Sequence, residues 1–200
     1  KRVILIGTKL KSKYNYPTPT HSPEYNNDKK NSAKYLTVSD AISDLPFIDS
    51  GKSANKYRLP PKNNFQKLMR KNNNILKDHN SSNHGKKMLA IMDALSDGDT
   101  IKDLPMHLKP KSGYGNTYAK LWWNKPCTTI TRNFGIPSSS RCIHPKVSRA
   151  LTTREGARIQ TFPDSFKFHG GRSSKNLQIG NAVPPLLSKF LADSIFQHFI

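Results

Sequence analysis

The sequence predicts a mixed α/β chain whose middle part is an irregular, basic α+β region. Three observations support this class. A continuous apolar run from Val3 to Ile6 is typical of a buried strand. Helical periodicity appears in several short segments and in an apolar stripe near the end of the chain. Between these segments the residues are mostly polar, and the mean hydropathy is −0.69, which indicates extensive loop and surface.

Helices are predicted where capping signals and apolar periodicity agree. The segment from Thr152 to Glu155 has a capping-box pattern, and Thr37 or Ser39 is a suitable cap for a helix that ends before Pro46. The expected helices span residues 37–45, 64–71, 86–95, 152–160 and 185–200. Runs of β-branched and aromatic residues predict strands over residues 1–8, 118–123 and 128–134, the last two joined by a turn at 124–126.

The charge of the chain indicates an anionic partner. The 200 residues include 33 Lys or Arg and 13 Asp or Glu, giving a net charge of +20. Residues 51–150 carry +14 of this charge, and aromatic side chains lie between the basic ones. This pattern favours nucleic acid. A solvated basic surface and a polybasic membrane contact are the alternatives, although the sequence has no strongly amphipathic basic helix.

Several classes of protein are excluded by the composition. No apolar run approaches the roughly 18 residues that a membrane-spanning helix needs, and no secretory signal is visible. Cys127 and Cys142 cannot form a disulfide framework or a four-ligand zinc site, so a reducing, intracellular setting is expected. The histidines lack compact metal-ligand spacing, and no metal site is predicted.

Four segments carry a family resemblance. In chain order, these are residues 1–7, the Trp-Asn-Lys-Pro-Cys-Thr-Thr-Ile segment at 123–130, the segment 149–164, and the Gln-Ile-Gly-Asn-Ala-Val-Pro-Pro segment at 178–185. They resemble the end of motif VIII, the Lys-Pro-x-x-Thr-Ile signature of the recognition region, motif IX and motif X of the DNA cytosine-5 methyltransferases. The resemblance is close at both ends and weak over residues 9–121, which correspond to the variable recognition region.

The resemblance implies a fold and a domain division. The chain is expected to be an α/β enzyme fragment, in which the terminal elements belong to a Rossmann-like S-adenosylmethionine domain. Residues 1–12 would end the motif VIII strand of this catalytic domain, and residues 13–150 would form an irregular α+β target-recognition domain that binds double-stranded DNA. Residues 151–200 would hold motifs IX and X and a C-terminal helix that returns to the catalytic domain.

The implied reaction is methyl transfer from S-adenosylmethionine to carbon 5 of a flipped-out cytosine, after a cysteine thiolate adds to carbon 6. The catalytic Pro-Cys and Glu-Asn-Val motifs are not in this sequence, whose two glutamates are Glu24 and Glu155. Pro126-Cys127 has the right dipeptide but belongs to the recognition signature. We therefore expect the catalytic Cys and Glu in a partner subunit or in the N-terminal half of one chain. The start at Lys1 rather than Met favours a fragment or processed piece.

The resemblance also assigns roles to individual residues. Arg2 would contact the flipped cytosine, with a surface arginine as the alternative. The segment Gly180, Asn181, Ala182 and Val183 would complete the cofactor site, with a simple turn before a helix as the alternative. The expected DNA contacts are Thr128, Thr129, Ile130, Arg132 and Arg141. Arg149, Arg154 and Glu155 are expected to be structural, through buried pairing of arginine with carboxylate.

These observations predict the recognition and cofactor-completing part of a bacterial DNA cytosine-5 methyltransferase of a restriction-modification system, cytoplasmic and associated with the nucleoid. Two alternatives remain open. The chain is a non-catalytic DNA-binding module, or it is an RNA-directed member of the same family that methylates tRNA.

Overall fold

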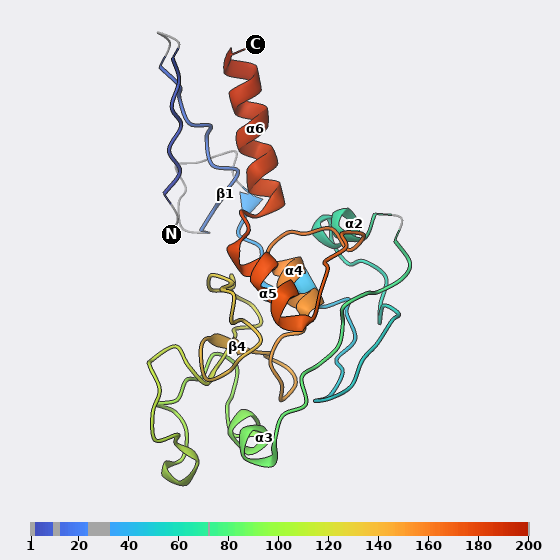
Figure 1. The fold of residues 1–200 in the computed structure, drawn as a ribbon, viewed down its shortest axis with the longest axis vertical. Helices are drawn as coiled ribbons and strands as arrows, with labels where there is room; N and C mark the ends of the chain where they lie inside the picture. Colours follow the sequence, from blue (N-terminus) through green and yellow to red (C-terminus); the bar gives the residue numbers. More distant parts are fainter. Residues whose placement is uncertain (1–2, 10–12, 24–32, 72, 200) are drawn as a thin grey trace. The chain divides into compact units, whose positions relative to one another are not determined.

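The protein has a mixed α/β fold in the computed structural model, which describes residues 3–9, 13–23, 33–71 and 73–199 (Figure 1). Backbone contacts divide the chain into two units. One contains residues 36–182, and the other combines residues 1–35 with residues 183–200. Each unit is described by itself.

Four short helices organise the larger unit. These are α1 (Val38–Ile42), α2 (Asn64–Arg70), α4 (Thr153–Ile159) and α5 (Arg172–Asn181). Helix α1 contacts both α2 and α4, and α4 contacts α5. Figure 1 shows α4 and α5 next to each other. Their apolar faces meet in one core, so the burial of side chains contributed by distant segments stabilises helices that are too short to be stable alone.

Capping boxes fix the starts of α1 and α4. The sequence predicts the box at α4, whereas at α1 it predicts only a cap, at Thr37 or Ser39. At α4, the Thr152 hydroxyl accepts from the amide of Glu155, and the Glu155 carboxylate accepts from the amide of Thr152 at 2.8 Å. At α1, Thr37 and Asp40 make the same reciprocal pair. Each cap satisfies amides that the first turn of a helix leaves unpaired. The helices expected at 64–71 and 86–95 are also present, as α2 and α3.

A second apolar cluster surrounds α3 (Lys86–Asp93) and the short 3-10 helix η1 (Met106–Leu108). Ile91 and Met92 of α3 are buried there with Leu104. The long polar connections on either side of this cluster account for the irregular appearance of the middle region in Figure 1.

The strands of this region differ from those predicted. Strand β3 (Ala119–Lys120) lies within the expected range of 118–123, but it pairs in parallel with β4 (Arg141–Ile143), a strand that was not predicted. The prediction of a strand over 128–134 was wrong. This segment turns instead, with the amide of Phe134 donating to the carbonyl of Thr131 at 3.1 Å. Among the described residues β3 pairs with β4 alone, and residues 128–134 do not join this sheet.

The smaller unit contains helix α6 (Pro185–Phe199) and the two-residue strands β1 (His21–Ser22) and β2 (Ala33–Lys34). Helix α6 confirms the helix expected at the end of the chain. The Tyr14 hydroxyl donates to Ser194 of this helix at 2.8 Å. The strand predicted over residues 1–8 is absent from its described part, where Val3 and Leu5 are 86% and 89% exposed. A strand needs a neighbour to pair with, and residues 3–8 have no strand beside them among the described residues.

Candidate nucleic-acid interface

Residues 128–136 form a loop that we call the recognition loop. Buried apolar side chains attach this loop to the core, and polar side chains between them are exposed. Ile130 and Phe134 are 4% and 1% exposed and belong to the main core. Thr128, Thr129 and Arg132 are exposed between these anchors. The alternation follows from the turn at Thr131 to Phe134, which directs the apolar side chains inward. Of the predicted DNA contacts, Ile130 is therefore buried, while the two threonines and Arg132 are accessible.

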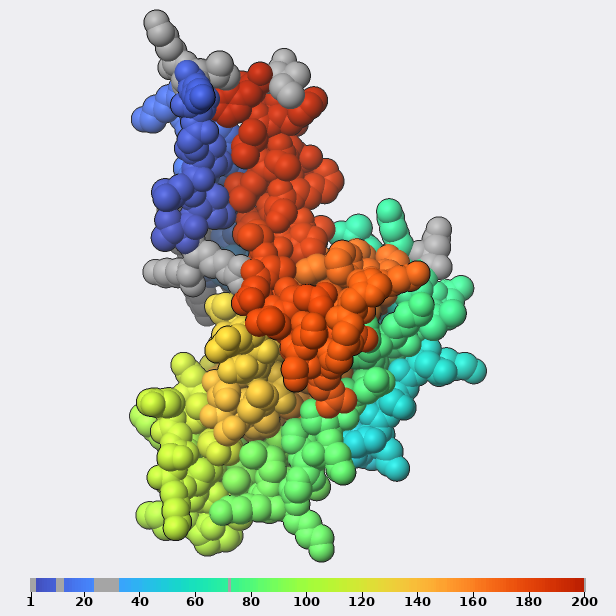
Figure 2. All heavy atoms as spheres, viewed as in Figure 1, coloured from blue at the N-terminus to red at the C-terminus, as the bar shows by residue number. Residues whose placement is uncertain are grey.

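The recognition loop is packed against the end of α5. A Cβ atom placed on Gly180 would lie 2.2 Å from the backbone nitrogen of Arg132 and 2.5 Å from its Cα. No side chain larger than hydrogen fits between the two backbones. Figure 2 shows the loop, coloured yellow, against the orange-red end of α5. The absence of a side chain at Gly180 thus allows the backbone of the recognition loop to pack directly against α5.

The residues after Gly180 are held in place by Gln160. Its side-chain amide donates to the carbonyl oxygens of Ile179 at 3.3 Å and Ala182 at 3.0 Å. Asn181 is exposed, and its side chain has no hydrogen-bond partner among the described residues. Val183, assigned to the other unit, is 49% exposed. The end of α5 therefore presents a free amide from a fixed backbone.

Arg149 and Glu155 form a buried, bidentate ion pair at the start of α4. The two guanidinium nitrogens of Arg149 donate to the two carboxylate oxygens at 2.7 and 2.8 Å. Burial alone would raise the pKa of Glu155, but the Arg149 guanidinium outweighs this effect and holds that pKa well below its usual range. Arg149 also donates to the carbonyl of Ile48, which ties the segment before α4 to the segment after α1.

A second buried network contains residues that the sequence did not single out. Arg158 donates to Asp44 at 2.9 Å and to Asp164 at 2.8 Å, and all three side chains are fully buried. Arg154, one helical turn before it, donates to the carbonyl of Lys77 at 2.9 Å and lies 3.8 Å from Asp164. The available signal was the pair of arginines four residues apart in α4, on the same face of the helix. Because α4 is buried, both charges must be paired.

His144 adds a titratable group to the first network. Its Nδ1 accepts from the amide of Lys146 at 3.0 Å, so the neutral ring carries its proton on Nε2. Nε2 lies 3.7 Å from a Glu155 oxygen and has no hydrogen-bond partner among the described residues. Burial lowers the pKa of His144 to about 3, although the Glu155 carboxylate opposes this shift. The native state therefore holds this histidine neutral.

Acidification is expected to destabilise the protein over the pH range in which His144 binds a proton in the unfolded state but not in the folded state. An unfolded histidine titrates near pH 6.5, and His144 titrates near 3 in the folded state, so stability should fall as the pH is lowered from 6.5 toward 3. Urea unfolding of the intact protein at pH 7.5 and pH 5 measures this difference. In His144→Asn, which keeps an acceptor for the Lys146 amide, the difference should shrink. An unchanged difference would contradict the assignment to His144.

The site combines a loop that exposes Arg132, a helix end with the free amide of Asn181, and a scaffold of buried ion pairs. A family model described as C-5 cytosine-specific DNA methylase matches residues 1–197. The chain belongs to this family. All four segments of the sequence resemblance lie within the matched range.

Relatives of this methylase chain include two bacterial type II methyltransferases. M.DdeI from Desulfomicrobium norvegicum is 33% identical over 100% of this chain and 51% of its own length. M1.HphI from Haemophilus parahaemolyticus is 31% identical over 98% of this chain and 43% of its own. DNA (cytosine-5)-methyltransferase 2 of Arabidopsis thaliana is 34% identical over 88% of this chain and 13% of its own. The chain thus spans about half the length of the bacterial relatives.

A solved structure has the same fold. It is a prophage-encoded protein of E. coli described as a DNA modification methyltransferase, with a TM-score of 0.61 and 24% sequence identity. The alignment covers 81% of this chain and 47% of the E. coli protein.

Arg141 occupies an interior position in the methylase chain. Its side chain is buried, and its guanidinium stacks over the ring of Trp122 at 4.0 Å. It donates to the carbonyl oxygens of Gly98 at 2.9 Å and Lys120 at 2.5 Å. This environment disagrees with the expected direct DNA contact, because the guanidinium is already used to join β4 to the segments at 98 and 120. Arg141 instead supports the framework beneath the recognition loop.

Burial disfavours the thiolate form of both cysteines of the methylase chain. Burial raises the pKa of Cys127 and of Cys142 to about 12, so the reactive thiolate is scarce near neutral pH. That Cys127 is not the catalytic cysteine, despite its Pro-Cys dipeptide, stays a prediction. Arg2, expected at the flipped cytosine, lies outside the described residues.

The described ranges of the methylase chain contain neither a membrane-spanning helix nor a cluster of metal ligands. None of its helices is long and apolar enough to cross a membrane. In these ranges no three His, Cys, Asp or Glu side chains gather closely enough to hold a metal ion.

Proposed function

We propose that this chain is the DNA-reading and cofactor-site-completing part of a DNA (cytosine-5-)-methyltransferase, in a bacterial restriction-modification system. The contact between Gly180 and the backbone of Arg132 carries the proposal. It joins the segment that resembles the family's recognition signature to the segment that resembles its motif X. A change in how DNA is held at the loop would therefore reach the cofactor segment directly.

The accessible side chains of the recognition loop suit contact with double-stranded DNA. Thr128 and Thr129 offer hydroxyls to bases or phosphates, and Arg132 offers an unpaired guanidinium. Arg2 would reach the oxygen of the flipped cytosine, where a guanidinium stabilises the charge that develops once carbon 6 is attacked. In the proposal the catalytic Cys and Glu come from a partner polypeptide or from a preceding part of the same one.

The end of α5 fits S-adenosylmethionine, which supplies the methyl group when bound. The free amide of Asn181 can pair with the amino acid part of the cofactor, while Ala182 and Val183 offer backbone groups. Gly180 has a positioning role in this scheme, since its open face is covered by the loop. The proposed domain division remains residues 1–12, 13–150 and 151–200.

Salt dependence and substrate choice test the proposal. Binding of duplex DNA by the complete enzyme should weaken steeply as the salt concentration rises. A plot of the logarithm of the binding constant against the logarithm of salt concentration has a slope of about −0.9 for each phosphate contact. A duplex that contains the target site should be preferred over tRNA. A flat salt dependence would contradict the DNA-binding assignment, and preferential methylation of tRNA would establish the RNA-directed alternative.

A further inference from the structure

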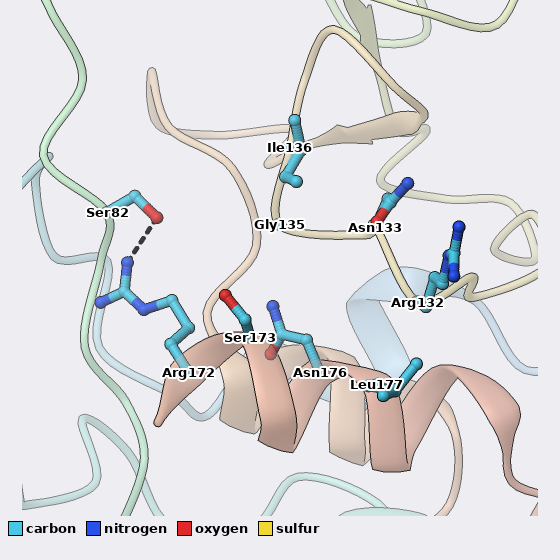
Figure 3. A pocket seen from close by; sticks show the side chains of 9 residues that line it. All are labelled: Ser82, Arg132, Asn133, Gly135, Ile136, Arg172, Ser173, Asn176 and Leu177. Carbon is cyan, nitrogen blue, oxygen red and sulfur yellow. Dashed lines mark hydrogen bonds between the residues drawn. The ribbon is translucent and has the colours of Figure 1, made fainter. Parts of the chain in front are cut away.

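A pocket of about 380 Å³ opens between the recognition loop and α5. Figure 3 shows the loop on one side, the first turns of α5 forming the floor, and the segment at Ser82 at the far end. It is lined by Ser82, Arg132, Asn133, Gly135, Ile136, Arg172, Ser173, Asn176 and Leu177. The lining includes two arginines, two amides and two hydroxyls, and it contains neither a carboxylate nor an aromatic ring.

The two arginines stand at opposite ends of this pocket (Figure 3). Arg172 donates to the carbonyl oxygens of Asn80 at 3.2 Å and Ser81 at 2.9 Å and to the hydroxyl of Ser82, which fixes its position. Arg132 is exposed and has no hydrogen-bond or ion-pair partner in the part of the chain that is described. One cation is thus fixed by the fold, and the other is available to a ligand.

Asn176 supplies the pocket with an amide donor for which the described residues offer no acceptor. Its side chain is 6% exposed, and its Oδ1 accepts from the hydroxyl of Thr153 at 2.9 Å. This bond directs the Nδ2 group toward the pocket, as Figure 3 shows, where it has no acceptor among the described residues. The fold keeps such a donor facing an open, positively charged space.

Gly135 keeps this space open. A Cβ atom at this position would lie 2.9 Å from Nδ2 of Asn176. A larger residue would therefore cover the donor from the side of the loop.

We propose that this pocket binds one phosphate of the DNA backbone, an inference that rests on the proposed function. A phosphodiester offers several acceptor oxygens with one negative charge, which suits the free Arg132 guanidinium, the Asn176 amide and the Ser173 hydroxyl. Arg172 and the first turn of α5 add positive potential. A flipped base is the less suitable ligand, because the lining has no ring on which a base would stack. The bound phosphate would set the register of the neighbouring residues Thr128 and Thr129 on the duplex.

Pairing protein variants with backbone-modified DNA tests this proposal in the complete methyltransferase. Duplexes with single, neutral methylphosphonate linkages scanned around the target site identify the phosphate concerned. At one position the modification should lower wild-type affinity about tenfold, the loss expected for a hydrogen bond to a charged group. The same linkage should have little further effect on Arg132→Gln, because the interaction is already lost. The salt slope of Arg132→Gln should also fall by about 0.9.

Gly135→Ala provides a second, uncharged perturbation of the same pocket. Like Arg132→Gln, it should be insensitive to the methylphosphonate at the identified position. Lys67→Gln is the control: it removes a charge from an exposed position of α2 and should be as sensitive as the wild type. If every variant remains as sensitive as the wild type at every linkage, the phosphate pocket is wrong, although DNA binding stands. If the wild-type enzyme does not bind the duplex at all, the proposed function itself fails.

Discussion

Replacement of Arg158 by leucine is expected to destabilise the protein by about 3–5 kcal/mol, the cost of removing one partner from a buried ion pair. Arg158 neutralises Asp44 and Asp164, both fully buried. Burial by itself would lower the pKa of Arg158, but its hydrogen bonds to the two carboxylates raise that pKa above the usual value. Arg158→Leu leaves Asp44 with the more distant guanidinium of Arg70 at 3.5 Å and Asp164 with that of Arg154 at 3.8 Å. Urea unfolding of the intact protein measures the loss.

An exposed ion pair is the control for this substitution. Lys189 and Asp193 lie four residues apart on α6 with side chains 71% and 54% exposed. Lys189→Ala should change stability by less than about 1 kcal/mol, since exposed pairs contribute little. An Arg158→Leu protein as stable as the Lys189→Ala protein would show that the buried network does not hold the helices together.

Replacement of Gly180 by alanine is expected to destabilise the fold by about 1–3 kcal/mol, the cost of overpacking that shifts a backbone, and to weaken DNA binding through the displaced recognition loop. The new methyl group would overlap the backbone of Thr131 and Arg132 and push the recognition loop away from α5. Titration of the duplex with the intact enzyme measures the change in affinity.

Gly171→Ala is the matched control, since a Cβ atom at Gly171 meets nothing within 4 Å. It should bind DNA as the wild type does. Wild-type affinity in Gly180→Ala would contradict the mechanical link between the loop and the motif X segment.

Helices were predictable because their signals are local. Thr37 with Asp40 and Thr152 with Glu155 are capping pairs three residues apart, and each begins a helix in the structure. Helix α5 was missed. Its N-cap is Gly171, which has no side chain to accept a hydrogen bond, and its sequence is mostly polar. The segment therefore shows neither a capping residue nor an apolar periodicity.

Strands were less predictable because pairing depends on distant partners. Residues 128–134 have β-branched and aromatic side chains, yet residues 141–143 pair with β3 instead. The apolar run at Val3 to Ile6 has a strand-like composition, but composition cannot supply a neighbouring strand. In both segments propensity was overridden by the tertiary context.

The candidate site was predictable residue by residue but not as an arrangement. Motif similarity identified Arg132 and Gly180 separately, and their backbone contact appears only in the fold. Arg141 and the exposed Arg132 are the same residue type in the same region, and burial alone separates their roles. Asp44 is distant in sequence from Arg158, so no local pattern connects the two.

Methyl transfer is the most direct test of the central claim. This chain is combined with the polypeptide, or the preceding part, that carries the Pro-Cys and Glu-Asn-Val motifs, and tritium-labelled S-adenosylmethionine and duplex DNA are added. Transfer of label to carbon 5 of cytosine is expected from the combination and from neither part alone. A combination that binds the duplex without labelling cytosine would contradict the account and leave a non-catalytic DNA-binding module.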